Sequence, residues 1–213
     1  MPKSTRDIIE EYLSTGNYSA TFEEIYALAK ESDGHPPWAY MQATPDLVQW
    51  ADKVQLSGEN KQAIVIGCGL GDDAEFLAKT GFDVTAFDVS ETAIRICKER
   101  FPDSTVSYHQ EDLFNLPDDW QGAFDFVLEN RTIQSLPQHM MAASMKAIAN
   151  LVRENGKLLI LCNGRNQEDS ANGVPHPLSH EELNTFLDYG LNETYFDDIR
   201  AGSVRRFVAL YQR

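Results

Sequence analysis

Residues 63–73, with the sequence AIVIGCGLGDD, decide the fold. Four apolar residues run directly into glycines at positions 67, 69 and 71, and two aspartates then precede the apolar pair Phe76 and Leu77. This order predicts a buried strand, a glycine turn and the start of a helix. Because glycine carries no side chain, the backbone of such a turn can closely approach a nucleotide-type ligand. The stretch therefore predicts a ligand-binding α/β sheet.

Asp88 and the two aspartates of the turn narrow the choice of ligand. Asp88 ends the next β-like run, where a carboxylate can accept hydrogen bonds from ribose hydroxyls, as both NAD and S-adenosylmethionine require. The dinucleotide fingerprint G-x-G-x-x-G needs a third glycine at the position of Asp72. Asp72 and Asp73 would compete with a pyrophosphate for the helix amides and repel it. An acidic rim suits the sulfonium and ammonium of S-adenosylmethionine, so this cofactor is predicted, with the product S-adenosylhomocysteine.

The rest of the chain alternates between the two periodicities. Runs of β character span residues 62–67, 82–88, 104–109, 123–129 and 156–162, and two late strands are expected near 191–197 and 203–211. Helical segments separate most of the early runs, which predicts a parallel sheet with crossover helices. Gly156 is expected to cap the end of a helix marked by Met141 and Met145, and Ser179 and Glu182 are expected to form a capping box.

Before residue 59 the pattern is helical. Apolar residues recur at helical spacing in two segments, first at Ile8, Ile9, Tyr12 and Leu13, then at Phe22, Ile25, Tyr26 and Ala29. Thr21 and Glu24 predict a capping box, and Pro45 opens a third helix. We expect a single domain over 1–213, with a helical N-terminal lid region over 1–58 and the core over 59–213. The lid is expected to include the loop 163–178.

Composition excludes several classes of partner. A formal charge of −15 would repel a phosphate backbone, so no nucleic-acid partner is expected. No apolar stretch approaches the roughly 20 residues of a membrane-spanning helix, and the first residues lack the apolar core of a signal peptide. We therefore expect a cytoplasmic protein without a membrane partner. Cys68, Cys97 and Cys162 are widely separated within apolar elements, which predicts buried free thiols and no metal site.

Five stretches together carry a resemblance to a known family. They are Pro36-Pro37-Trp38 with Pro45, residues 67–73, residues 87–90 with Ala93-Ile94, residues 111–114, and residues 124–132. In these stretches the chain resembles class I S-adenosylmethionine-dependent methyltransferases, nearest the bacterial group similar to thiopurine and thiol methyltransferases. The resemblance covers nearly everything after residue 36. It implies an α/β, Rossmann-like, doubly wound sheet of seven mostly parallel strands with an antiparallel last strand, and N-terminal helices that form a lid.

The resemblance also implies roles for individual residues. Glycines 67, 69 and 71 would let the backbone approach the cofactor, Asp88 would hold the ribose, and Trp38 would cover the site. Asp112 and Leu113 would flank the adenine, and Glu129 would lie beside the sulfonium. The full set expected to bind the cofactor is Trp38, Gly67, Cys68, Gly69, Gly71, Asp73, Asp88, Val89, Asp112, Leu113 and Glu129. Two departures stand out: Val65 replaces a common acidic residue, and Asn130 stands where related chains tend to have aspartate.

The methyl acceptor is not identified by the sequence. Methyl transfer is a displacement at an activated carbon, so no nucleophilic side chain of the protein is required. A thiolate or selenide needs no base, whereas an alcohol or amine does. His35, Glu129, Arg131 and His176 are the catalytic candidates, and Arg131 could bind an anionic acceptor. We expect a small-molecule acceptor with a sulfur or similarly soft atom. The alternatives are an O- or N-methyltransferase of a metabolite, a noncatalytic S-adenosylmethionine-binding domain, and an NAD-linked oxidoreductase. The sequence does not indicate the oligomeric state.

Overall fold

A seven-stranded sheet runs through the computed structural model, which describes residues 8, 11–12, 16–31, 34–171, 174–202 and 204–213. The strand order is β3-β2-β1-β4-β5-β7-β6. The strands are β1 (Gln62–Ile66), β2 (Asp83–Asp88), β3 (Ser107–Gln110), β4 (Phe124–Asn130), β5 (Val152–Asn163), β6 (Asn192–Ala201) and β7 (Val204–Gln212). β7 is antiparallel to both of its neighbours, and the pairs from β3 to β5 are parallel. The predicted mostly parallel sheet with an antiparallel last strand is confirmed.

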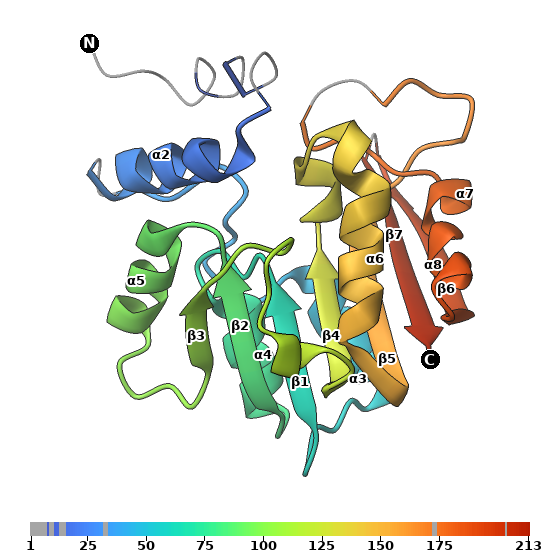
Figure 1. Ribbon diagram of the computed structural model, residues 1–213, viewed down its shortest axis with the longest axis horizontal. Helices are drawn as coiled ribbons and strands as arrows, with labels where there is room; N and C mark the ends of the chain where they lie inside the picture. The colour runs from blue at the N-terminus through green and yellow to red at the C-terminus, as the bar shows by residue number, and fades with distance from the viewer. Residues whose placement is uncertain (1–7, 9–10, 13–15, 32–33, 172–173, 203) are drawn as a thin grey trace.

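Helices cover both faces of the sheet (Figure 1). They are α2 (Tyr18–Glu31), α3 (Pro45–Val54), α4 (Asp72–Lys79), α5 (Glu91–Arg100), α6 (Met141–Leu151), α7 (His180–Leu183) and α8 (Thr185–Asp188), with short 3₁₀ turns at Asp118–Trp120, Ile133–Ser135 and Gln138–Met140. Ile64 packs in the cluster with α6, whereas Val65 packs in the cluster with α3 and α4. A strand buried on both faces is a continuous apolar run, and this is why residues 63–66 show no alternation.

The junction between α6 and β5 corrects one prediction. α6 ends at Leu151, and Gly156 lies within β5 and does not cap the helix. The pairing of β5 with β4 shifts register between Phe124 and Phe126, and Asn155 takes the left-handed conformation there, with φ of 62°. A Cβ on Gly156 would lie 2.8 Å from the carbonyl oxygen of Phe124. Glycine is therefore required by the close approach of two backbones in the bulge.

The helix starts agree with the sequence in part. α2 begins at Tyr18, so Thr21 lies inside the helix and the predicted box with Glu24 is wrong. The Asn17 side chain accepts from the Ala20 amide at 3.3 Å instead. The capping box of Ser179 and Glu182 is present, and α3 begins at Pro45 as predicted. In the first predicted helix Ile8 and Tyr12 are buried, while the predictions for Ile9 and Leu13 lie outside the described residues.

The structure tests the predictions about the cysteines and about membrane-spanning helices. Cys68, Cys97 and Cys162 are all buried and free. None of the helices in the described ranges has the length and apolar character that a bilayer crossing needs.

Candidate functional site

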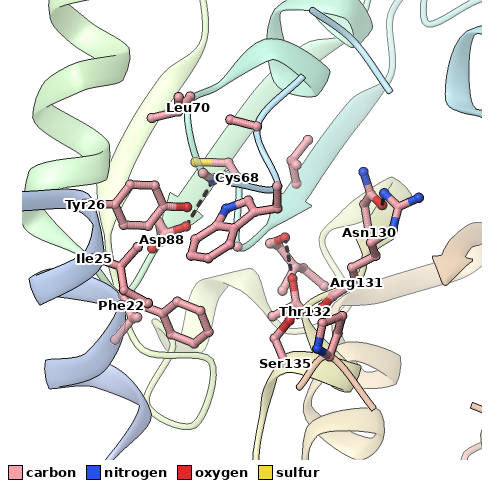
Figure 2. Close-up of a pocket in the computed structure, with 18 of the residues that line it drawn as sticks. Phe22, Ile25, Tyr26, Cys68, Leu70, Asp88, Asn130, Arg131, Thr132 and Ser135 are labelled. Atoms are coloured by element: carbon pink, nitrogen blue, oxygen red, sulfur yellow. Dashed lines mark hydrogen bonds between the residues drawn. The ribbon is translucent and has the colours of Figure 1, made fainter. Parts of the chain in front are cut away.

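A cavity of about 440 Å³ opens where β1, β2 and β4 end. This is the edge at which open α/β sheets bind their ligands, and the volume falls in the usual range for small-molecule sites. Figure 2 shows Phe22 and Tyr26 of α2 on one side of the cavity, and Arg131 and Thr132 from the turn after β4 on the other. The lining is dominated by aromatic and aliphatic side chains. The cavity therefore brings together a sheet edge and an N-terminal helix.

The glycine turn forms the floor of the cavity. Gly67 and Gly69 both line it, and both take positive φ, of 57° and 55°. A Cβ on Gly67 would lie 2.5 Å from Oγ1 of Thr132, and one on Gly69 would lie 3.1 Å from the Tyr26 hydroxyl. Gly71 precedes α4 as its N-cap and is not among the described residues that line the cavity. The first two glycines therefore leave room above the backbone that any other residue would fill.

Asp88 lies beside this turn at the end of β2, almost fully buried. Its Oδ2 accepts from the Gly69 amide and its Oδ1 from the Ser90 amide, each at 3.0 Å (Figure 2 shows the first of these). Burial raises the pKa of Asp88 to about 6, although the two amide donors favour the ionised form. Val89 and Cys68 also line the cavity. The carboxylate is thus fixed by backbone donors at the place predicted for ribose recognition.

The two aspartates after the turn have separate partners. Asp72 forms a salt bridge with Arg100 at 2.8 Å. Asp73 is partly buried and accepts from the Thr44 amide at 2.7 Å and from Nδ2 of Asn130 at 2.7 Å. Burial raises the pKa of Asp73 above its ordinary value, against those hydrogen bonds. Both aspartates line the cavity, and an amide at position 130 supplies the donor that Asp73 needs.

Asp112, Leu113 and Trp38 also line the cavity. The Tyr18 hydroxyl donates to both oxygens of Asp112, at 2.9 and 2.8 Å. Burial and the neighbouring Asp112 raise the pKa of Tyr18. Trp38 meets Phe22 and Tyr26 edge to face, with ring centroids 6.1 and 5.9 Å apart. These three predicted residues therefore lie close to α2, and the carboxylate of Asp112 is held by a hydroxyl of that helix.

Arg131 projects from the turn after β4 with a left-handed backbone, φ 63°. Its guanidinium donates to Oδ1 of Asn130 at 2.9 Å and lies 3.7 Å from the carboxylate of Asp46. Arg206 lies 2.9 Å from the same carboxylate. Arg131 lines the cavity. The Asp46 carboxylate therefore faces two arginines, and the charge of Arg131 also acts to lower the pKa values of Asp73 and Glu129, against the effect of burial.

Glu129, His35 and His176 are not among the described residues that line the cavity. Glu129 is fully buried, and its Oε1 accepts from the amides of Thr132 at 2.6 Å and Ile133 at 3.0 Å. Burial raises its pKa to about 7. His176 holds a surface loop through its amide, which donates to the Gln134 carbonyl at 2.6 Å. The Nδ1 of His35 lies 3.3 Å from the carbonyl of Pro36.

Several lining residues were not predicted to be functional. Phe22, Ile25 and Tyr26 were predicted only as the apolar face of a helix, and Tyr18 was not singled out. Three aromatic residues within nine positions of one helix are the signal that the sequence did offer. Thr44 was predicted only as the residue before a helix, and its contact with Asp73 joins residues 29 apart in sequence. No local pattern reveals such a pair.

Comparison with known proteins gives consistent matches. The model of the family described as thiopurine S-methyltransferase matches residues 28–206. Thiocyanate methyltransferase 1 of Brassica oleracea is 26% identical over 166 residues, covering 75% of this chain and 67% of the relative. A ubiquinone biosynthesis O-methyltransferase of Aromatoleum aromaticum is 30% identical over 125 residues, covering 57% of this chain and 52% of the relative. The chain thus spans about half to two thirds of the length of these curated relatives.

A solved structure is similar over most of the chain. It is the 1,6-didemethyltoxoflavin-N1-methyltransferase of Burkholderia thailandensis with bound 1,6-didemethyltoxoflavin and S-adenosylhomocysteine. The TM-score is 0.70 at 15% identity, and the match covers 96% of this chain and 90% of that one. At this identity the likeness concerns the fold, which is the fold predicted from the sequence.

Proposed function

The chain belongs to the thiopurine S-methyltransferase family of class I S-adenosylmethionine-dependent methyltransferases, and from this premise we propose that it methylates a small molecule at a sulfur or similarly soft atom. The observation that carries the proposal is the pairing of Asp88 with a glycine turn whose following helix begins with two carboxylates. The Asp88 carboxylate can accept from ribose hydroxyls, and Asp73 at the start of the helix would repel a pyrophosphate, whereas Asp72 is paired with Arg100.

The residues that would hold S-adenosylmethionine fit the group. Gly67 and Gly69 leave space that a Cβ would fill, and Asp88 has a buried carboxylate facing that space. Asp88 would bind the ribose hydroxyls, Asp112 and Leu113 would flank the adenine, and Trp38 would cover the site. When bound, the cofactor supplies a methyl group on a positively charged sulfur.

Glu129 and Gly71 take an indirect role in this proposal. Glu129 shapes the turn that carries Arg131 and Thr132 by accepting from two of its amides. Gly71 starts the helix that carries Asp73. Both residues would act on the cofactor through the backbone that they position.

Three features favour a soft acceptor. His35, His176 and Glu129, the groups considered as bases, are not among the described lining residues, and a thiolate needs no base. Arg131 lines the cavity, and its guanidinium would bind an anionic acceptor. The thiocyanate methyltransferase relative is named for a sulfur-containing anion. An O- or N-acceptor is the second candidate, favoured by the ubiquinone O-methyltransferase relative.

The described part of the N-terminal region would act as a lid within a single methyltransferase domain. Aromatic residues of α2 and of the segment after it line the site together with two residues of a later loop. They are Tyr18, Phe22, Tyr26, Trp38 and Tyr40, with Val174 and Pro175 from the loop. These segments would exclude water and select the acceptor. The cytoplasmic location and the lack of a nucleic-acid partner remain predictions.

An acceptor comparison tests the proposed chemistry. Purified protein with S-adenosylmethionine is given thiocyanate, thiophenol or the matching phenol, and S-adenosylhomocysteine formation is followed. Thiophenol should react on the order of 100-fold faster than phenol. The thiol reacts as its thiolate without a base, whereas the phenol needs a general base to remove its proton. Turnover on phenol alone would contradict the sulfur assignment. Cofactor binding without turnover on any acceptor in a broad panel would indicate a noncatalytic domain.

A further inference from the structure

Glu23 of α2 has no role in the proposed mechanism, but it contacts the start of α5 in the core. Its carboxylate accepts from the Ser90 hydroxyl at 2.6 Å, from the Thr92 hydroxyl at 2.6 Å and from the Thr92 amide at 3.1 Å. Ser90 and Thr92 stand at the beginning of α5, and Figure 1 shows α2 lying across that end of the helix. A carboxylate there satisfies a free amide and is favoured by the helix dipole.

Ser90 connects this contact to the cavity. It is fully buried, and its amide donates to Oδ1 of Asp88 at 3.0 Å while its hydroxyl donates to Glu23. The other oxygen of Asp88 accepts from the Gly69 amide. A continuous series of hydrogen bonds thus runs from α2 through Ser90 and Asp88 to the glycine turn.

We propose that Glu23 is a positioning residue of the cofactor site, which holds the Asp88 carboxylate through Ser90 and ties α2 to the start of α5. The inference rests on the proposed function for the identity of the ligand. A carboxylate that is already held in place loses less conformational entropy when a ligand binds, so the affinity is higher. Glu23 also places a second negative charge near Asp88.

The charges around Asp88 make this arrangement sensitive to pH. Burial is the main cause that raises the pKa of Asp88, and the charge of Glu23 raises it further. Tyr26 from α2 and Cys68 from the glycine turn also face Asp88. Burial raises the pKa of Tyr26, and hydrogen bonding with Cys97 together with burial raises the pKa of Cys68, so neither group becomes charged while Asp88 titrates. Although burial opposes it, the hydrogen bonds from Ser90 and Thr92 and the charge of Arg95 hold the pKa of Glu23 below its ordinary value. Glu23 therefore stays ionised while Asp88 titrates.

The test is calorimetric binding of S-adenosylhomocysteine at pH values on both sides of 6. In the wild type, affinity should rise as Asp88 ionises, and Asp88→Asn should remove that rise. In Glu23→Gln the midpoint should fall by about half a pH unit or more, because a like charge has gone. Its affinity at high pH should also fall severalfold. The control Glu99→Gln removes another contact between α5 and α2, with Lys30 at 2.7 Å, and should leave the midpoint unchanged.

A second variant separates charge from folding. Glu23→Asp keeps the charge on a shorter side chain, so its midpoint should stay near that of the wild type while its affinity falls. An unchanged midpoint in Glu23→Gln, or an equal shift in Glu23→Asp or Glu99→Gln, would overturn the inference. So would a wild-type affinity that does not change with pH. Absence of any binding to the wild type would instead refute the proposed function.

Discussion

The two carboxylate oxygens of Glu129 lie in different surroundings. Oε1 accepts from two amides, while Oε2 is buried without a hydrogen-bond partner. Burial raises its pKa from 4.5 to about 7. A raised carboxyl pKa means that the folded protein binds the proton more tightly than the unfolded chain. Ionisation of Glu129 therefore costs stability as the pH rises from about 4.5 through 7, on the order of 3 kcal/mol in total.

Glu129→Gln tests this directly. The neutral amide can still accept from Thr132 and Ile133, but it does not titrate. The stability of the variant relative to the wild type should therefore increase between pH 5 and pH 8, by about 1 to 3 kcal/mol. Urea unfolding at the two pH values measures this, and comparing the two proteins removes the effect of Asp88. A difference that is the same at both pH values would show that Glu129 does not titrate in this range.

Individual site residues were predictable where the local pattern determines their place. Gly67, Gly69 and Asp88 follow from a strand, a turn and the end of the next strand, and they line the cavity. The hydrogen bonds of Asp73 with Thr44 and Asn130 join residues 29 and 57 apart in sequence. They depend on how elements pack, which one sequence does not reveal. The cofactor contacts of all these residues remain predictions.

At the scale of elements, all seven strands were predicted, but some ends were not: β3 begins three residues later and β6 ends four residues later than the predicted runs. β1, β2 and β4 begin and end within one residue of the runs seen in the sequence. β5 begins at Val152, four residues before the predicted strand. The difference arises because the bulge at Asn155 breaks the apolar pattern while the pairing continues on both sides. A turn residue such as glycine fits both a cap and a bulge, and only the backbone contact distinguishes them.

Gly156→Ala tests the bulge. An added methyl group would lie 2.8 and 2.9 Å from the carbonyl oxygens of Phe124 and Arg153. Both are backbone atoms that cannot rotate away, so the variant should lose about 1 to 3 kcal/mol of stability, as overpacked sites do. Chemical denaturation measures the loss, with Gly122→Ala as the control. Gly122 has positive φ, unlike Gly156, and nothing lies within 4 Å of an added Cβ, so this variant reports the cost of backbone strain without a close contact. A loss of less than about 1 kcal/mol in Gly156→Ala would show that the bulge accommodates the methyl group.

At the scale of the whole molecule, the sheet and α2 differ in how far the sequence could predict them. The sheet follows from apolar runs at regular spacing, so its fold class was expected before any contact was known. The position of α2 over the cavity depends on polar contacts such as Tyr18 with Asp112 and Glu23 with Thr92. The apolar face of α2 was predicted to be buried, but no local pattern indicates the surface against which it packs. The part of the site that we propose to select the acceptor is therefore the part that the sequence predicts least.

One binding measurement tests the account most directly. Calorimetry compares S-adenosylmethionine, S-adenosylhomocysteine and NADH on the wild type and on Asp88→Ala. We predict micromolar binding of the first two ligands to the wild type, no measurable binding of NADH, and a loss of at least about tenfold in the variant, since a hydrogen bond to a charged group contributes about 1.5 to 3 kcal/mol. Tight binding of NADH, or no binding of S-adenosylmethionine and its product, would contradict the methyltransferase assignment.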